Sequence, residues 1–218
     1  MKYSAVVERL YARGRQFFSK NYRLWPPNNK RWPGVFYETP NEYHKIYEDG
    51  LRQTQMKDNP ARRLRYFTIS QAIRNTLQVP GDAVEAGCYR GLSAWLAATA
   101  LQRHGRELTF HICDSFAGLS EPQAADAPVY ESKKTGGHKF ACDEAQVREN
   151  LSVFNFIEYH KGWIPSQFGT LQDCRFCYAH IDVDLYEPTR DSIEFIWPRV
   201  NRGRSEEHTS ELQSQNRI

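Results

Sequence analysis

Short apolar segments alternate with amphipathic ones through the middle of the chain, and this alternation limits the fold more than any other feature of the sequence. Four segments have the length and apolar character of strands: 82–86, 108–113, 156–160 and 176–183. Apolar residues recur at helical spacing in the segments between them, as at 69–77 and 92–102. Apolar strands that alternate with helices are typical of a parallel sheet covered on both faces. We therefore predict an α/β protein with a Rossmann-like, doubly wound parallel sheet.

Two further helices are predicted from their first residues. Asp143, followed three residues later by Gln146, is typical of a capped helix start. The last helix is expected to begin near Pro188, which a first helical turn accepts. Its expected buried stripe consists of Ile193, Ile196 and Trp197.

The sequence divides into three parts. Residues 1–60 are predicted to be irregular because prolines interrupt them, and their aromatic side chains indicate packing onto the rest of the protein. Residues 61–203 are predicted to form a partial Rossmann-like domain. Residues 204–218 are predicted to be non-native, because 204–214 correspond residue for residue to the in-frame translation of a common sequencing-library adapter. The natural reading frame is then expected to continue differently, which leaves this domain incomplete at its C-terminus.

Composition is ordinary for a globular protein, with 40% hydrophobic and 25% charged residues. The net charge of +3 includes a basic concentration in residues 1–65, which a solvated surface explains better than nucleic acid or anionic lipid. No apolar run reaches the roughly 18 residues of a membrane-spanning helix, and Met1 is not followed by a secretory signal. We therefore expect a cytoplasmic protein that binds neither nucleic acid nor membrane; assembly into a homo-oligomer is left open.

Five cysteines without a secretory signal indicate free thiols. Cys174 and Cys177 have the spacing of a redox or zinc-binding pair, but Cys177 opens an apolar strand and the sequence holds no second such pair. Buried structural cysteine is therefore the favoured interpretation.

The first candidate site is the turn from the first strand into the following helix, VEAGCYRGLS at 84–93. Gly87 and Gly91 allow the backbone to pass close to a ligand, and the start of the helix offers unpaired N–H groups to a carboxylate. The alternative is that both glycines serve the turn alone. The G-x-G-x-x-G pattern of dinucleotide-binding proteins is absent from this turn.

The second candidate site is the end of the second strand, where Asp114 is placed to accept both hydroxyls of a ribose. Its alternative role is to cap a turn. Because the two sites follow neighbouring strands, a cofactor that contains a nucleoside accounts for both.

The third candidate site is the end of the fourth strand. Asp182 and Asp184 are two residues apart there, and two neighbouring carboxylates repel unless a divalent cation or a proton lies between them. Metal binding by one and general-base catalysis by the other is the favoured division. The alternative is capping of the last helix by Asp184 or Glu187. His180 is expected to be a packed strand residue.

Together the three stretches resemble the macrocin O-methyltransferase family, through GDAVEAGCYRG at 81–91, CDSFAGL at 113–119 and HIDVDLYEPT at 180–189. The resemblance extends over roughly half of the chain, from Gly81 to Arg199. It implies a class I methyltransferase fold, S-adenosylmethionine as the cofactor and Mg²⁺ as an aid to catalysis. The implied partner is a small hydroxylated acceptor, a sugar or a glycosylated natural product.

The resemblance also implies roles for the matching residues. Those expected at the methionine part of the cofactor are Glu85, Gly87, Gly91 and Ser93. Those expected at its ribose and adenine are Asp114, Ser115, Phe116, Gly162 and Trp163. Asp182 would bind Mg²⁺, and Asp184 would be the catalytic base or a second ligand.

The chain departs from the family after the last predicted helix. The family continues with a Gly-Gly turn, a strand and an Asp-Asp-Tyr segment that adds metal ligands, whereas here residues 198–201 lead into the adapter-like tail. The uncovered sheet edge beside the fourth strand predicts a poorly soluble or inactive chain. His138 is an alternative base, although a solvated loop histidine is favoured.

Three other functions stay open. A metal-dependent glycosyltransferase would use Asp182 and Asp184 to hold a metal and a nucleotide diphosphate, but Glu85 and Asp114 on successive strands argue against it. A dehydrogenase would need the absent middle glycine. The third is a fragment that binds cofactor without turnover.

Overall fold

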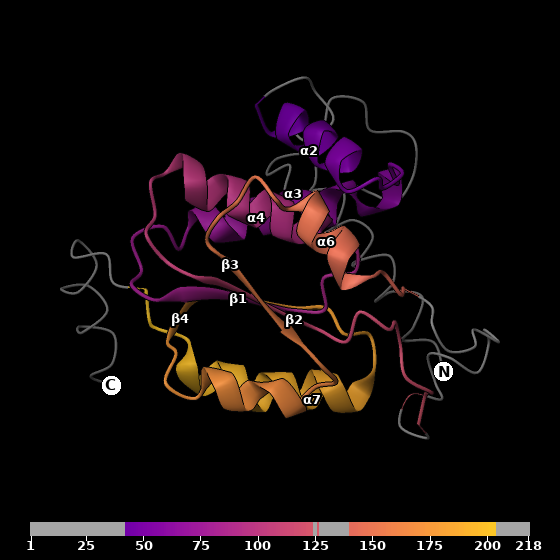
Figure 1. Cartoon of the computed structure of the whole chain (residues 1–218). Coiled ribbons are helices and arrows are strands. Elements are labelled where there is room, and N and C mark those ends of the chain that lie inside the picture. The colour runs from indigo at the N-terminus through magenta and orange to yellow at the C-terminus, as the bar shows by residue number, and fades with distance from the viewer. Residues whose placement is uncertain (1–41, 124–125, 127–139, 204–218) are drawn as a thin grey trace, which may run out of the picture.

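The computed structural model describes residues 42–123, 126 and 140–203, and these residues form a four-stranded parallel sheet with helices on both faces (Figure 1). In chain order the elements are α2 (Glu42–Gln53), η1 (Pro60–Arg62), α3 (Arg63–Arg74), β1 (Asp82–Ala86), α4 (Leu92–Arg103), β2 (Phe110–Asp114), α6 (Glu144–Asn150), β3 (Ile157–Lys161), η3 (Ser166–Leu171), β4 (Phe176–Ile181), α7 (Tyr186–Ile196) and η4 (Trp197–Arg199). The α/β prediction is confirmed.

The strand order is β3-β2-β1-β4, with every neighbouring pair parallel. The chain builds outward from β1 to β3 and then returns to place β4 on the other side of β1, so the order reverses beside β1. In Figure 1, α3, α4 and α6 cover one face of the sheet and α7 lies on the other. This is the doubly wound arrangement, in which ligands bind where the strand order reverses.

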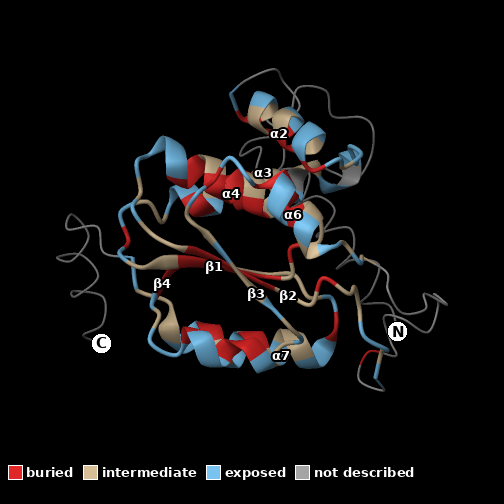
Figure 2. Ribbon diagram, viewed as in Figure 1, coloured by how far each residue is buried: buried red, intermediate tan, exposed pale blue. Residues whose placement is uncertain are grey.

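The core is concentrated around α4. Its alanines and leucines are buried on nearly all sides, including Ala97, Ala98 and Leu101, which pack in one cluster with Ile73 of α3 and Phe110 of β2. Figure 2 shows α4 and β1 as largely buried, and the residues of β1 and β2 are nearly all buried. Small side chains let α4 approach both the sheet and the neighbouring helices closely, which anchors the turn that precedes it.

A helix, α2, forms within the stretch that the sequence predicts to be irregular. Tyr43 and Tyr47 are one helical turn apart and are buried against Leu92 and Leu96 of α4. This i, i+4 aromatic pair is a helical signal that the surrounding prolines obscure. Residues 1–41 lie outside the described residues.

Two of the helix predictions are wrong in detail. Asp143 precedes α6 but makes no side-chain capping hydrogen bond, and the Gln146 amide donates to the side chains of Glu149 and Asn150. In the last helix, Ile196 is buried, whereas the side chains of Ile193 and Trp197 are 49% and 75% exposed.

The predicted strands and loops match the structure closely at the sheet. The first strand has the predicted bounds, and the fourth ends at Ile181, before Val183. His138, most of the loop at 120–139 and residues 204–218 lie outside the described residues. All five cysteines are free thiols, as predicted. Within the described part of the chain, no helix is both long and apolar enough to cross a bilayer.

Candidate active site

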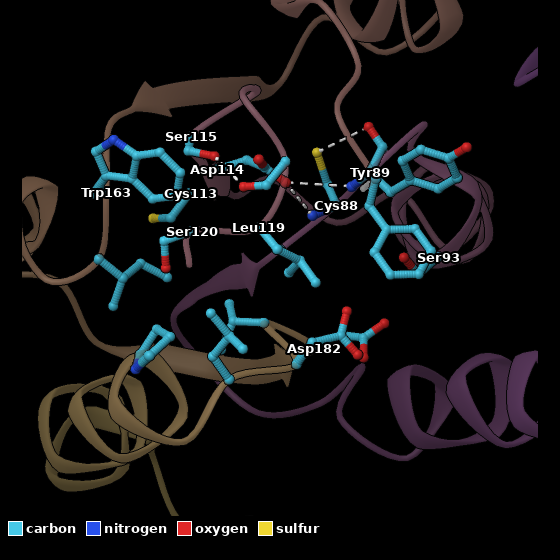
Figure 3. A pocket seen from close by; sticks show the side chains of 18 of the residues that line it. Cys88, Tyr89, Ser93, Cys113, Asp114, Ser115, Leu119, Ser120, Trp163 and Asp182 are labelled. Atoms are coloured by element: carbon cyan, nitrogen blue, oxygen red, sulfur yellow. Dashed lines mark hydrogen bonds between the residues drawn. The ribbon is translucent and has the colours of Figure 1, made fainter. Parts of the chain in front are cut away.

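A cavity of about 400 Å³ opens where the carboxyl ends of β1, β2 and β4 meet the loops that follow them (Figure 3). This volume is within the usual range for small-molecule sites. The sequence-predicted residues that line it are Gly87, Ser93, Asp114, Ser115, Gly162, Trp163, Asp182 and Asp184. Residues from all three candidate stretches therefore face one cavity. Figure 3 shows Asp114 and Asp182 on opposite sides of it.

The turn from β1 to α4 forms one wall, and Gly87 determines its shape. Gly87 has a φ of 83°, and a Cβ added there would lie 2.3 Å from the carbonyl oxygen of Asp182. Only glycine fits such a close approach between the ends of β1 and β4. Gly91, with a φ of 90°, precedes α4 and packs near Leu151 rather than lining the cavity.

Asp114 joins the turn after β1 to the turn after β2. Its Oδ2 accepts hydrogen bonds from the backbone N–H groups of Cys88, at 2.7 Å, and Tyr89, at 3.3 Å. Its Oδ1 accepts from the N–H of Phe116 at 2.8 Å. An ionised carboxylate has about four acceptor positions, so Asp114 can accept hydroxyl hydrogens as well. Phe116 itself is buried and does not line the cavity.

Glu85 lies beneath the wall rather than on it. Its side chain is 1% exposed, and its Oε1 is 2.7 Å from Nδ1 of His180 on β4. Burial acts to lower the pKa of His180, but the hydrogen bond and charge of Glu85, aided by Asp182, outweigh burial and raise it. Glu85 is not among the described residues that line the cavity, and its Oε1 pairs with His180 whereas its buried Oε2 has no hydrogen-bond partner in the described part of the chain.

The opposite wall is acidic. Four of the carboxylates that line the cavity follow β4 or belong to α7: Asp182, Asp184, Glu187 and Asp191. The Asp182 N–H donates to the Ala86 carbonyl at 2.8 Å, which holds it beside β1, and Asp184 has a left-handed φ of 62°. This wall offers the oxygen ligands that Mg²⁺ prefers.

The first N–H group of α7 is capped by a residue from a distant part of the chain. Asp126, which is buried, accepts the Tyr186 N–H at 2.7 Å with one oxygen and the Gln123 N–H at 2.8 Å with the other. Asp126 thus caps the first N–H group of α7, and Asp184 is among the residues that line the cavity. The Asp126 contact spans 60 positions of sequence, so spacing alone gives no signal for it.

The sequence analysis missed a third wall, which comes from α3 and the residues before it: Met56, Arg62, Arg65 and Tyr66. Arg65 forms an ion pair with Asp182 across 117 positions of sequence. Burial raises the pKa of the Tyr66 hydroxyl. The only sequence signal for this wall is the density of arginines at the start of α3.

Residues 55–204, more than half of the chain, match the sequence profile of the family described as Macrocin-O-methyltransferase (TylF). The chain belongs to the macrocin O-methyltransferase family. The match includes all three stretches that meet at the cavity, and the resemblance seen in the sequence is confirmed.

Two O-methyltransferases are similar to this chain over part of their length. The chain is 30% identical over 132 residues to 8-demethyl-8-(2,3-dimethoxy-alpha-L-rhamnosyl)-tetracenomycin-C 4'-O-methyltransferase of Streptomyces olivaceus, covering 57% of this chain and 51% of that protein. It is 28% identical over 150 residues to demethyldecarbamoylnovobiocin O-methyltransferase of Streptomyces niveus, covering 64% of this chain and 56% of that protein. The chain thus spans about half the length of the curated relatives it matches.

A solved O-methyltransferase has the same fold. The O-methyltransferase NovP superposes with a TM-score of 0.56 at 25% sequence identity, covering 70% of this chain and 69% of NovP. The parallel sheet and its helices are therefore those of a methyltransferase.

Proposed function

We propose that this chain forms the cofactor-binding part of an S-adenosylmethionine-dependent O-methyltransferase that acts on a hydroxyl of a sugar or a glycosylated natural product. The observation that carries the proposal is the single cavity in which a turn of glycines and Asp114 faces a wall of carboxylates. The relatives named above methylate a rhamnosyl-bearing tetracenomycin and a novobiocin precursor, which supports an acceptor of this class.

The wall formed by β1 and β2 would bind the cofactor. Gly87 and Ser93 would lie at its methionine part, where the start of α4 offers N–H groups to the carboxylate. Asp114 would accept hydrogen bonds from the ribose hydroxyls beside Ser115, and Gly162 and Trp163 would lie near the adenine. Glu85, Gly91 and Phe116 would act indirectly, because each supports a cavity wall from beneath.

The acidic wall fits Mg²⁺, since its donor atoms are carboxylate oxygens. Asp182 would be a ligand, and Arg65 balances its charge in this structure. When bound, Mg²⁺ would lower the pKa of the acceptor hydroxyl and orient it. Asp184, two residues further on, would take the proton.

When bound, S-adenosylmethionine would supply a methyl group from its sulfonium sulfur to the acceptor hydroxyl. Asp184 would take the proton that this hydroxyl loses. Cofactor and acceptor would enter from opposite walls, so their orientation would be determined by the backbone contact between Gly87 and Asp182.

Binding of S-adenosylmethionine to this chain, measured by calorimetry, tests the proposal. Gly87→Ala is expected to weaken binding at least about tenfold, because its Cβ would force the ends of β1 and β4 apart. Gly169→Ala is the matched control, because a Cβ there meets nothing within 4 Å. Asp182→Ala should leave cofactor affinity unchanged and abolish the heat of Mg²⁺ binding to the cofactor-saturated chain.

Two results would contradict this assignment. Preferential binding of a uridine diphosphate sugar over S-adenosylmethionine would favour a glycosyltransferase. Loss of cofactor binding in Asp182→Ala, with the fold intact by circular dichroism, would mean that the acidic wall also binds the cofactor, contrary to the proposed assignment.

A further inference from the structure

A second cluster of metal-binding side chains lies away from the cavity, on two neighbouring strands. His111 of β2 is directly beside Glu158 of β3, and Cys113 is beside His160, so the side chains of His111, Glu158 and His160 share one face of the sheet. Cys113 packs on that face with Phe168 of η3. None of the three clustered residues is among the described residues that line the cavity.

The distances within the cluster suit one metal ion. His111 Nδ1 is 3.0 Å from His160 Nε2 and 3.7 Å from Glu158 Oε2, and all three ligand atoms lie within 4.8 Å of one another. Nitrogen and oxygen ligands around tetrahedral zinc are about 3.4 Å apart, given metal–ligand distances near 2.1 Å. The strands therefore already hold these atoms at separations that an ion requires.

The hydrogen bonds of His160 determine which of its nitrogens carries the proton. The Thr170 hydroxyl donates to the Gln167 carbonyl at 2.8 Å, so its oxygen accepts from His160 Nδ1 at 3.1 Å. The proton of a neutral His160 is then on Nδ1. Its Nε2 is left with a lone pair that points at His111.

Both ring nitrogens of His111 have polar neighbours. His111 is buried, and its Nε2 faces the carboxylate of Asp82 at 3.6 Å and the sulfur of Cys174 at 3.9 Å. Its Nδ1 faces the carboxylate of Glu158 at 3.7 Å as well as Nε2 of His160. The 3.0 Å separation of the two imidazole nitrogens fits an N–H···N hydrogen bond, and a metal ion bound here would take the place of that proton.

The outer contacts also fit a metal site, because ligating histidines usually donate their second N–H to a carboxylate or another oxygen. Here Asp82 and Thr170 supply those oxygens.

We propose that His111, His160 and Glu158 bind one transition-metal ion, with Zn²⁺ the best fit to two imidazoles and a carboxylate. The Glu158 side chain is 63% exposed, which gives the ion a route from solvent and leaves a position for water. The ion would join the edge strand β3 to β2. It would be independent of the Mg²⁺ proposed at Asp182, because imidazole ligands select against hard cations such as Mg²⁺.

Calorimetric titration of the chain with Zn²⁺, in excess Mg²⁺, tests the site. One ion per chain is expected to bind, and His160→Gln is expected to weaken binding at least about tenfold. His104→Gln is the matched control, since His104 is exposed at the end of α4, and Asp182→Ala should also leave Zn²⁺ binding unchanged. Equal binding by His160→Gln and the unaltered chain, or no binding by the unaltered chain, would overturn the proposal.

Cobalt spectroscopy of the unaltered chain identifies the ligands without relying on a variant that has to fold. Co²⁺ at His111, His160 and Glu158 should give visible absorption without a thiolate charge-transfer band. Asp82, His111 and Cys174 form a rival set that would use the other nitrogen of His111. A thiolate band that disappears in Cys174→Ser would assign the ion to that set and overturn the proposed ligands.

Discussion

The two faces of the sheet are covered to different degrees (Figure 2). On the face of α3 and α4, the helices bury an extended cluster that includes Ile73, Leu101 and Phe110. On the face of α7, a smaller cluster forms around Phe176 and Ile196. The difference originates in the helices, because α4 is apolar on nearly all sides whereas α7 carries one narrow apolar stripe.

The two faces also differ in how far their polar side chains are exposed to solvent. The well-covered face contains the ion pair of Glu85 and His180, which is nearly sealed from water. The less covered face contains the His111 and His160 pair, whose neighbour Glu158 reaches solvent. Polar side chains enclosed by the core can form hydrogen bonds only with other protein groups. Polar side chains that reach solvent can also bind an ion from solution.

The largest expected effect is on the well-covered face. Phe110→Ala should lower the free energy of unfolding by about 3–5 kcal/mol, because it removes a fully buried ring from the centre of the core. Urea denaturation followed by circular dichroism measures the change. A loss below about 1 kcal/mol would mean that this face is loosely packed, and the contrast between the faces would disappear.

An intermediate effect is expected at the enclosed ion pair. Glu85→Gln should cost about 1–3 kcal/mol near about pH 6, because it replaces a charged hydrogen-bond acceptor for His180 by a neutral one. The raised pKa of His180 means that the stabilisation is complete below its ordinary value of 6.5 and is lost as the pH rises through the raised pKa. The cost should therefore shrink towards about pH 9, as urea denaturation across this range would measure. A cost that does not vary with pH would show that His180 is neutral in the folded protein.

The smallest expected effect is on the less covered face. Trp197→Ala should change the free energy of unfolding by less than about 0.5 kcal/mol, because three quarters of the side chain is already exposed. Thermal unfolding of both chains provides the measurement. A clear destabilisation would indicate that this tryptophan is covered in solution, which would make the two faces more alike than they are here.

Much of the sheet could be predicted because its signals are local. The bounds of β1 could be predicted because Gly81 and Gly87 flank an apolar run. The end of β2 could be predicted because the polar Asp114 ends the next apolar run. The glycines and carboxylates that directly follow the strands were expected to lie close together for the same reason. Parallel strands bring their carboxyl ends together without any further information.

The errors concern side chains whose environment depends on distant residues. Helical spacing places Ile193 and Trp197 on an apolar stripe, but spacing does not say what lies opposite that stripe. The pairing of Glu85 with His180, 95 positions away, likewise has no signal in the local sequence. Arg65 was missed as a cavity residue because its ion-pair partner, Asp182, lies 117 positions away in the sequence and comes close to it only in the folded chain.

The contact at Gly87 has a consequence for how such proteins diversify. Because the backbones that carry the two walls touch there, a change at this position would alter the proposed cofactor side and the proposed acceptor side together. Under the proposed function, selection at this position could not adjust one affinity while it left the other alone. New acceptor preferences would then be more accessible through side chains in or just before α3, such as Arg62 and Tyr66, which line the cavity outside both backbone turns.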